Sequence, residues 1–373
     1  MIWDKLTSLT KLLPGETSHQ LALATLSLGM HPRYSPVQLP GEVAGLHFYN
    51  PVGLAAGFDK NAKVMAGCFA LGFGSVEIGT VTPLPQPGNP KPRVFRLPED
   101  NAFINRYGFN SHGMEVVALR LSKWRSSKLV GQILGVNIGA NRASKNKIED
   151  YYIACSRLAG LVDYVSINIS SPNTIGIRDL QKSGSLEKII ESVKYALVEA
   201  NLVKPIFVKL SPDLNKKELF HAIEIMVNEG VSGVIMSNTT VSRFGLKNMK
   251  NREQDGGLSG EPLFRLSCEK LSEAYSFAAG KIAFIGVGGI STASDAYTKI
   301  LLGADILQLY SSLAINGPHI VNQINTGLVK LCLGEGLKNL KEACGIFNSF
   351  DKANRYAEHA ANKHLKNDSL SSF

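Results

Sequence analysis

The amino-acid sequence predicts an α/β protein, a (β/α)8 TIM barrel with an N-terminal helical extension and a hairpin over the barrel mouth. Between residues 50 and 331, eight apolar strand-like runs alternate with eight amphipathic segments, as in a parallel sheet whose strands are joined by helices. Each run also ends in a polar or glycine-containing cluster, and barrel enzymes carry their chemistry at these carboxyl ends. A doubly wound sheet is the structural alternative, but no reversal of strand order is evident.

The expected strands are short apolar runs, and the segments between them have helical periodicity. The strands cover residues 52–55, 75–81, 131–138, 164–169, 205–210, 233–237, 282–286 and 306–309. The helices cover residues 61–71, 112–125, 147–160, 185–200, 214–229, 262–279, 291–302 and 318–331. A chain of 373 residues is long for one ordinary domain but fits one barrel with additions.

Three stretches fall outside this alternation. The connection TPLPQPGNPKPRVFRLPEDNAFINRYGFN (82–110) is far longer than the usual loop after a barrel strand, and its segments PRVFRL and AFINRY predict a hairpin. Residues 1–40 are expected to form an extension with two short helices, IWDKLTSLTKLL and SHQLALATLSLG, separated by Pro14-Gly15. Residues 41–347 then form the barrel domain, and the polar tail at 348–373 is expected to be flexible.

Composition and cysteine usage exclude several protein classes. With 44% hydrophobic and 19% charged residues, the chain is expected to be a soluble globular protein with a large core. No run reaches the roughly 18 apolar residues of a transmembrane helix, and the acidic, lysine-interrupted N-terminus resembles neither a secretory signal nor a mitochondrial presequence. An odd number of cysteines, scattered along the chain, indicates a reducing compartment and no metal site. They are Cys68, Cys155, Cys268, Cys332 and Cys344.

The formal net charge of +9 suggests a negatively charged partner. Nucleic acid, an anionic membrane and an anionic substrate remain open on this ground, and so does a charge that merely keeps the protein in solution. Charge alone does not choose between these four explanations.

Glycines and hydroxyls at the last two strand ends indicate a phosphate site. In (β/α)8 barrels a phosphate often binds at the loops after strands seven and eight, where backbone N–H groups converge. The segment GVGGI (286–290) ends the seventh expected strand, and Tyr310-Ser311 follows the eighth. Together they favour a phosphorylated cofactor or substrate. The GxGxxG fingerprint is absent, so a Rossmann dinucleotide site is not expected.

The segment VSINISSPNT (165–174) is a strand that ends in a cluster of hydroxyls and amides. Its alternation of apolar and polar residues predicts a half-buried strand with Asn168 near its end. Two lysines, Lys60 after the first strand and Lys209 on the fifth, are expected to project into the same mouth. A buried lysine is costly unless it faces an anion. A solvent-exposed lysine is the commoner case, but the neighbours of Lys209 are those of a buried strand.

Ten motifs occur in order along the chain: NPVGLAAGFDKNA, EIGTVTPLPQPGNPKPRVFRL, INRYGFNSHG, GVNIGANR, INISSPNT, VKLSPDL, SNTT, GGLSGEPL, IGVGGI and QLYSS. With them the sequence resembles the dihydroorotate dehydrogenases, and among these the membrane-associated, quinone-reducing class 2. The resemblance extends from about residue 5 to residue 347. It implies oxidation of (S)-dihydroorotate to orotate in de novo pyrimidine (UMP) biosynthesis, with FMN as hydride acceptor and a quinone as final electron acceptor.

The resemblance implies that Ser171 is the catalytic base, at a position where the cytosolic class 1 enzymes usually carry cysteine. A serine hydroxyl is a weak base, so it needs a desolvated site and a proton relay, for which Thr174 is a candidate. Further residues are implied to bind the substrate. They are Lys60, Asn105, Arg106, Tyr107, Gly108, Phe109, Asn168, Asn173, Asn238 and Thr239.

A second set of residues is implied to hold FMN. Lys209 is expected beside the flavin, where its charge would stabilise the anionic reduced form, and Ser237 stands where the family often has threonine. The implied set comprises Ala56, Gly57, Phe58, Asp59, Lys60, Thr80, Asn137, Asn168, Lys209, Ser237, Gly260, Gly289, Tyr310 and Ser311.

Residues 1–40 are implied to enter the membrane surface and to form a tunnel through which quinone reaches the flavin, with His19, Arg106 and Tyr310 as polar contacts. A helical pair that merely caps the barrel is the plainer alternative. The expected location is peripheral, on the cytoplasmic side of a bacterial-type inner membrane. The chain is expected to be a monomer, and no nucleic acid partner is expected.

Three other functions compete with this interpretation. A class 1 enzyme that uses fumarate or NAD is disfavoured by Ser171 and by residues 1–40. A tRNA dihydrouridine synthase, another FMN barrel, would need a cysteine at a strand-end motif, and none of the five is there. A basic binding protein without activity would leave the polar strand ends unexplained.

Overall fold

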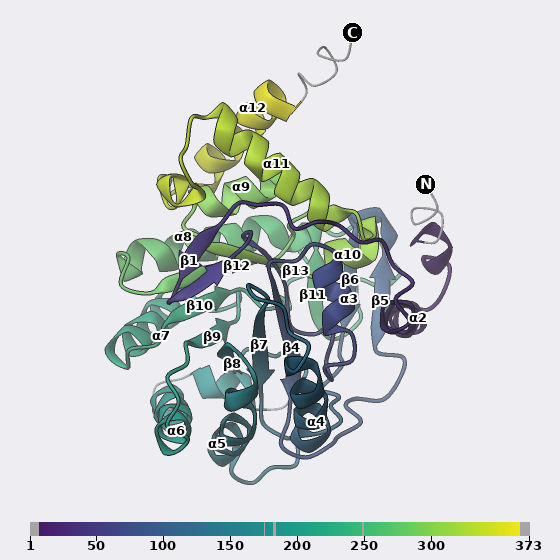
Figure 1. Ribbon diagram of the computed structural model, residues 1–373, viewed down its shortest axis with the longest axis vertical. Helices are drawn as coiled ribbons and strands as arrows, with labels where there is room; N and C mark the ends of the chain where they lie inside the picture. The colour runs from purple at the N-terminus through teal and green to yellow at the C-terminus, as the bar shows by residue number, and fades with distance from the viewer. Residues whose placement is uncertain (1–6, 175, 182–183, 248–249, 366–373) are drawn as a thin grey trace.

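The computed structural model describes residues 7–365 except 175, 182–183 and 248–249. At its centre is a closed barrel of parallel strands (Figure 1). In order around the barrel these are β3 (Val52–Leu54), β4 (Ser75–Val81), β7 (Ile133–Ile138), β8 (Tyr164–Asn168), β9 (Ile206–Leu210), β10 (Gly233–Met236), β12 (Ala283–Val287) and β13 (Ile306–Leu309). Parallel pairing of β13 with β3 closes the barrel. The predicted (β/α)8 barrel is therefore confirmed, and the doubly wound alternative is excluded.

Helices follow the barrel strands and cover its outside. They are α3 (Met65–Ala70), α4 (Met114–Arg125), α5 (Lys147–Leu158), α6 (Ser185–Glu199), α7 (Lys216–Asn228), α8 (Phe264–Ala278), α9 (Ala293–Leu301) and α11 (Ile320–Gly334). Local sequence fixes where several begin. At α7, the Asn215 side chain accepts from the Glu218 N–H while the Glu218 carboxylate accepts from the Asn215 N–H. This reciprocal cap satisfies two backbone donors that the helix cannot use itself.

The amino end of the barrel is closed by a hairpin that the sequence did not predict. Strands β1 (Gly41–Val43) and β2 (Leu46–Phe48) pair in antiparallel fashion. Val43 and Phe48 from this hairpin pack against residues near the starts of the barrel strands, among them Ile133, Tyr164 and Phe207. The opposite, carboxyl end is therefore left for a ligand.

A three-stranded antiparallel sheet lies at this carboxyl end. Strands β5 (Val94–Leu97) and β6 (Ala102–Asn105) form the expected hairpin, and β11 (Gly257–Gly260) pairs with the other edge of β6. We call these three strands the lid sheet. Leu97, Ile104 and Leu258 form the centre of its own small core. The segment GLSG of β11 has no apolar alternation, so the sequence did not predict this third strand.

The N-terminal extension packs against the lid sheet. Helix α2 (Gly15–Ser27) lies beside β5 (Figure 1). A glycine permits this approach, because a β-carbon at Gly15 would lie 2.7 Å from Val94 Cγ1. Residues 7–10 are helical, whereas residues 2–6 of the first expected helix lie outside the described residues. Among the described helices, none is long and apolar enough to cross a bilayer.

The expectation of a flexible tail from residue 348 is wrong for most of that segment. Residues Phe350–Leu365 form helix α12, which packs against α9 and α11 (Figure 1). Ala353, Ala357 and Ala360 are buried on one face of α12. Small side chains allow close helix packing although the segment is polar overall, and a search for large apolar residues misses such a face. Residues 366–373 lie outside the described residues.

Candidate active site

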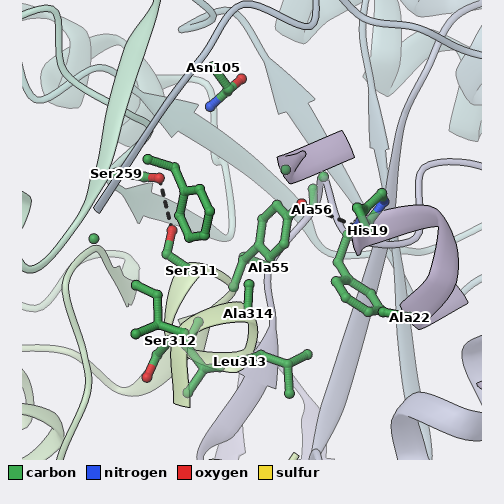
Figure 2. A pocket seen from close by; sticks show the side chains of 18 of the residues that line it. His19, Ala22, Ala55, Ala56, Asn105, Ser259, Ser311, Ser312, Leu313 and Ala314 are labelled. Carbon is green, nitrogen blue, oxygen red and sulfur yellow. Dashed lines mark hydrogen bonds between the residues drawn. The ribbon is translucent and has the colours of Figure 1, made fainter. Parts of the chain in front are cut away.

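A cavity of about 770 Å³ opens at the carboxyl ends of the barrel strands, within the range of small-molecule and cofactor sites. The barrel strand ends form its floor, the lid sheet and α2 form its walls, and the short helix α10 (Ser311–Asn316) completes it. Figure 2 shows His19 and Ala22 entering from α2 and the Ser311–Ser259 hydrogen bond of 2.9 Å on the other side.

Asn168, at the end of β8, is held by side chains from β4 and β7. Its Nδ2 donates to Thr80 Oγ1 and to Asn137 Oδ1, both at 3.0 Å, and Thr80 Oγ1 donates to Asn137 Oδ1 at 2.6 Å. Asn238 Nδ2 donates to Ser170 Oγ at 2.9 Å. The amides at the cavity floor are therefore fixed in orientation before any ligand binds.

A layer of buried polar groups lies below these amides and is centred on Glu77. Its carboxylate accepts from Asn137 Nδ2 at 2.9 Å, Tyr164 OH at 3.0 Å and Gln308 Nε2 at 2.9 Å. Lys209, 5% exposed, lines the cavity above this layer. Burial lowers the pKa of Lys209, while the nearby Glu77 charge opposes that shift. Glu77 therefore helps to keep a cation at the bottom of the cavity.

Ser171 lies at the cavity in the loop after β8. It is 6% exposed, and its Oγ accepts from the Asn173 N–H at 3.3 Å. Asn173 Nδ2 reaches Asn105 Oδ1 of the lid sheet at 3.5 Å. The neighbouring hydroxyl, Thr174 Oγ1, is buried and has no hydrogen-bond partner among the described residues. This loop therefore presents a nearly buried hydroxyl beside the Asn173 amide.

Lys60 supplies a second cation to the cavity wall. Its Nζ donates to the Gly57 carbonyl and lies 4.0 Å from the centre of the Tyr107 ring. Burial, and secondly the charge of Arg93, lower the pKa of Lys60 to about 7, against the opposing effects of Glu16 and Asp59. No salt bridge in the described part of the chain pairs Lys60 with a carboxylate. The amine is thus placed to receive an anionic ligand.

The loop after β12 offers backbone rather than side chains to the cavity. Gly288 and Gly289 have φ angles of +109° and +74°, a region that favours glycine. A β-carbon on Gly289 would lie 2.5 Å from Phe264 Cβ. The exposed peptide groups of this loop suit an oxyanion such as phosphate.

The α2 side of the cavity is more apolar and carries a neutral histidine. His19 Nδ1 lies 3.5 Å from Tyr310 OH, and the His19 ring contacts Phe58 with centroids 5.2 Å apart. Burial, and then the charge of Lys60, lower the pKa of His19 to about 3. Its imidazole is therefore neutral at physiological pH and can donate or accept a hydrogen bond without bearing charge.

Arg96 on β5 points into the same side. Its Nη2 donates to the Thr10 carbonyl at 3.3 Å, and its guanidinium lies 5.2 Å from the centre of the Phe103 ring. Its Nε is buried and without a hydrogen-bond partner among the described residues. A buried donor without a partner is unfavourable, so this atom marks a position where a ligand acceptor would be stabilised.

Comparison with known proteins assigns the family. Residues 38–332 match the family described as dihydroorotate dehydrogenase. The chain belongs to the dihydroorotate dehydrogenase family. It is an oxidoreductase, and the resemblance seen in its motifs is confirmed.

Relatives within the family cover nearly the whole chain. A dihydroorotate dehydrogenase (quinone) from Parvibaculum lavamentivorans is 46% identical over 340 residues, covering 90% of this chain and 96% of its own. The mitochondrial dihydroorotate dehydrogenase (quinone) of Arabidopsis thaliana is 42% identical, covering 90% of this chain and 79% of its own. The solved structure of the Eimeria tenella dihydroorotate dehydrogenase with ferulenol superposes with a TM-score of 0.86 at 36% identity, covering 89% and 95% of the two chains.

Most of the predicted family site residues line the cavity. Those that do are His19, Ala56, Gly57, Phe58, Lys60, Thr80, Asn105, Tyr107, Gly108, Phe109, Asn168, Ser171, Asn173, Lys209, Ser237, Asn238, Thr239, Gly260, Gly289, Tyr310 and Ser311. Asp59, Asn137 and Arg106 do not. Asn137 lies one layer below the cavity, and the Asp59 carboxylate accepts from the N–H groups of Lys63 and Val64, so it shapes the loop instead.

Arg106 is the clearest correction. Its guanidinium donates to Gln254 Oε1 at 3.0 Å and to the Pro92 carbonyl at 3.1 Å, on the outer face of the lid sheet. The hairpin carries three arginines, Arg93, Arg96 and Arg106. Because side chains alternate along a strand, they could have been assigned to faces only with the register of the hairpin known. The arginine that lines the cavity is Arg96. It lies in the PRVFRL motif, but the motif alone did not indicate that its side chain enters the site.

Proposed function

We propose that this chain oxidises (S)-dihydroorotate to orotate, with FMN as hydride acceptor and a quinone as final electron acceptor, as a step of de novo pyrimidine biosynthesis. One observation carries the proposal: a single cavity joins the Ser171 loop, the glycine loop after β12 and the apolar α2 side. A substrate, a phosphorylated cofactor and an apolar acceptor could therefore meet within one enclosed volume. The names of the quinone-dependent relatives support the same activity.

At the substrate end, Ser171 would take the proton from C5 of dihydroorotate. Its low exposure fits a hydroxyl that must act away from bulk water, and the unpartnered Thr174 Oγ1 is available for a proton relay. Asn105, Asn168, Asn173 and Asn238 would hold the ring, because an imide edge needs both donors and acceptors. Lys60 would pair with the carboxylate.

The residues present fit FMN. Two observations support this: the positive-φ glycines after β12 leave backbone N–H groups free of side chains, and Lys209 is a nearly buried cation at the cavity floor. When bound, FMN would accept the hydride and pass electrons onward. Lys209, steadied by Glu77, would stabilise negative charge on it, and Ser237, Gly260, Gly289, Tyr310 and Ser311 would contact it.

The quinone would approach along α2. His19, neutral because of its lowered pKa, and Arg96, through its unpartnered Nε, would supply hydrogen-bond donors to a quinone oxygen, with Tyr310 beside them. Large apolar side chains are exposed in the same extension, and this favours contact with a membrane surface. They are Leu9, Leu12, Leu13, Leu21, Leu28 and Met30. We therefore propose residues 1–40 as a peripheral membrane-binding unit of a monomeric enzyme on the cytoplasmic side of the inner membrane.

The activity is tested by following flavin colour. Purified protein should be yellow, lose its visible flavin absorbance when dihydroorotate is added without oxygen, and regain it on adding a soluble quinone. Fumarate or NAD should not restore the colour. Colourless protein, or protein that is reoxidised by fumarate as fast as by quinone, would contradict the proposal.

A second prediction concerns Lys60 and pH. Because the protonated amine attracts a carboxylate, orotate affinity should be constant below about pH 7 and weaken above it, approaching tenfold per pH unit. Lys60→Met should bind orotate more weakly and without this dependence, whereas Lys63→Met, an exposed lysine of the same loop, should keep it. Titration of orotate into oxidised enzyme at several pH values measures this. An unchanged pH profile in Lys60→Met would show that another group titrates; His19, with its pKa of about 3, is not that group.

A further inference from the structure

A lysine with no solvent exposure lies behind the glycine loop, outside the cavity. Lys299, on α9, is 0% exposed. Its Nζ donates to Ser267 Oγ of α8 at 2.7 Å, lies 3.5 Å from Cys268 Sγ, and is 5.3 Å from the centre of the Phe264 ring. No carboxylate among the described residues forms a salt bridge with it. Burial lowers the pKa of Lys299, and the nearby Cys268 and Asp295 only oppose that shift. A lysine in so dry a position is costly, so its presence there calls for an explanation.

The contacts of Lys299 lead directly to the cavity wall. Ser267 Oγ lies 2.8 Å from the Phe264 carbonyl and 3.1 Å from the Gly288 carbonyl, and its single O–H is shared between these oxygens while Oγ accepts from Lys299. Gly288 and Gly289 line the cavity. One hydroxyl and one peptide group thus separate the lysine from the space where a ligand would lie.

The Ser267 bond also fixes the direction of that peptide. The C=O and N–H of one trans peptide point in opposite directions. Because the Gly288 carbonyl is turned toward Ser267, the Gly289 N–H is turned away from α8. No hydrogen bond within the described residues uses the Gly289 N–H, so it is free to bind an acceptor in the cavity.

We propose that Lys299 and Ser267 are positioning residues for the cofactor phosphate. Ser267 orients the Gly288–Gly289 peptide, and Lys299 donates to Ser267 and, when protonated, places a positive charge behind the phosphate. The charge is screened little because the site is dry. The inference rests on the proposed function, since it takes FMN as the ligand, and it concerns the phosphate alone.

The test compares two flavins that differ only in the phosphate. Lys299→Met keeps the volume of the side chain and removes its charge, so the Kd for FMN measured on apoprotein should rise roughly 10- to 100-fold. The Kd for riboflavin, which has no phosphate, should change by less than about threefold, since a purely structural defect would affect both ligands. Lys270→Met serves as control, because it removes a cation from α8 that pairs with Glu273 instead.

Ser267→Ala gives an independent arm if Lys299→Met folds poorly. It should also reduce the preference for FMN over riboflavin, through loss of the bond to the Gly288 carbonyl. An unchanged preference in the variants that fold, or an equal loss of both flavins, would overturn the proposal. Wild-type protein that binds neither flavin would instead contradict the proposed function itself.

Discussion

Ser171→Ala is expected to bind FMN and orotate normally but to lose flavin reduction by dihydroorotate, by roughly 10²- to 10⁴-fold. The hydroxyl is nearly buried, and its contact with the Asn173 N–H involves the loop backbone rather than another acid or base. Among the described residues, the one hydrogen bond of Ser171 Oγ is to this N–H, and the nearby Thr174 hydroxyl is no stronger a base than the serine it would replace. Stopped-flow reduction under anaerobic conditions measures the loss directly, since a single turnover does not depend on quinone.

Ser171→Cys is the matched control for this prediction. A thiol can act as a base in its ionised form, so this variant should retain partial activity and show a shifted pH profile. Orotate titration checks that both variants keep the site intact. Near-normal single-turnover reduction in Ser171→Ala would refute the assignment of the base.

Deletion of residues 1–35 is expected to affect reoxidation of the flavin by quinone far more than its reduction by dihydroorotate. Helix α2 contributes His19 and Ala22 to one wall of the cavity but does not contribute Ser171, Lys60 or the floor amides. Dihydroorotate should therefore still bleach the flavin, although more slowly because Arg93 loses its partner Glu16, whereas quinone should fail to reoxidise it. Binding to liposomes should fall as well, because the exposed leucines are removed. Stopped-flow reoxidation and vesicle sedimentation measure the two effects.

Point variants in the full chain distinguish residues that bind quinone from residues that contact the membrane. Arg96→Gln should weaken the use of a soluble quinone, and Arg106→Gln, on the outer face of the lid sheet, should not. Leu12→Ser with Leu28→Ser should reduce vesicle binding and leave soluble-quinone kinetics unchanged. Truncated protein with wild-type quinone kinetics and unchanged vesicle binding would refute the role proposed for residues 1–40.

The barrel could be predicted because its strands carry a strong local signal. Runs such as Ser75–Val81 are rich in β-branched residues, and the observed bounds of this strand are those expected. β11 depends instead on pairing with β6, a contact between residues far apart in the chain. The α12 helix was missed for a related reason, since its buried face consists of alanines and becomes apparent only against α9 and α11.

The site residues could be predicted where a family motif lies at a strand end. They could not be predicted where the direction of a side chain decides whether it enters the cavity. Ser171 and Lys60 line the cavity as the motifs indicated. Arg96 and Arg106 lie on opposite faces of the hairpin, and the sequence alone does not give the register that decides which face each occupies. Nothing in the sequence indicated a role for Lys299, because its neighbours come from α8, α9 and the glycine loop, which meet only in the folded protein.

The ion pair between the extension and the lid sheet limits how this protein can be re-engineered. Arg93 Nη2 lies 2.7 Å from Glu16 Oε1, with side-chain exposures of 7% and 15%, and Arg93 also holds the Pro87 and Asn89 carbonyls. Asn89 in turn donates to the Asn173 carbonyl beside Ser171. A chimaera carrying the extension of another relative must therefore keep a carboxylate at position 16. Without it, Arg93 would remain as an unpaired buried cation between the exchanged segment and the substrate loop.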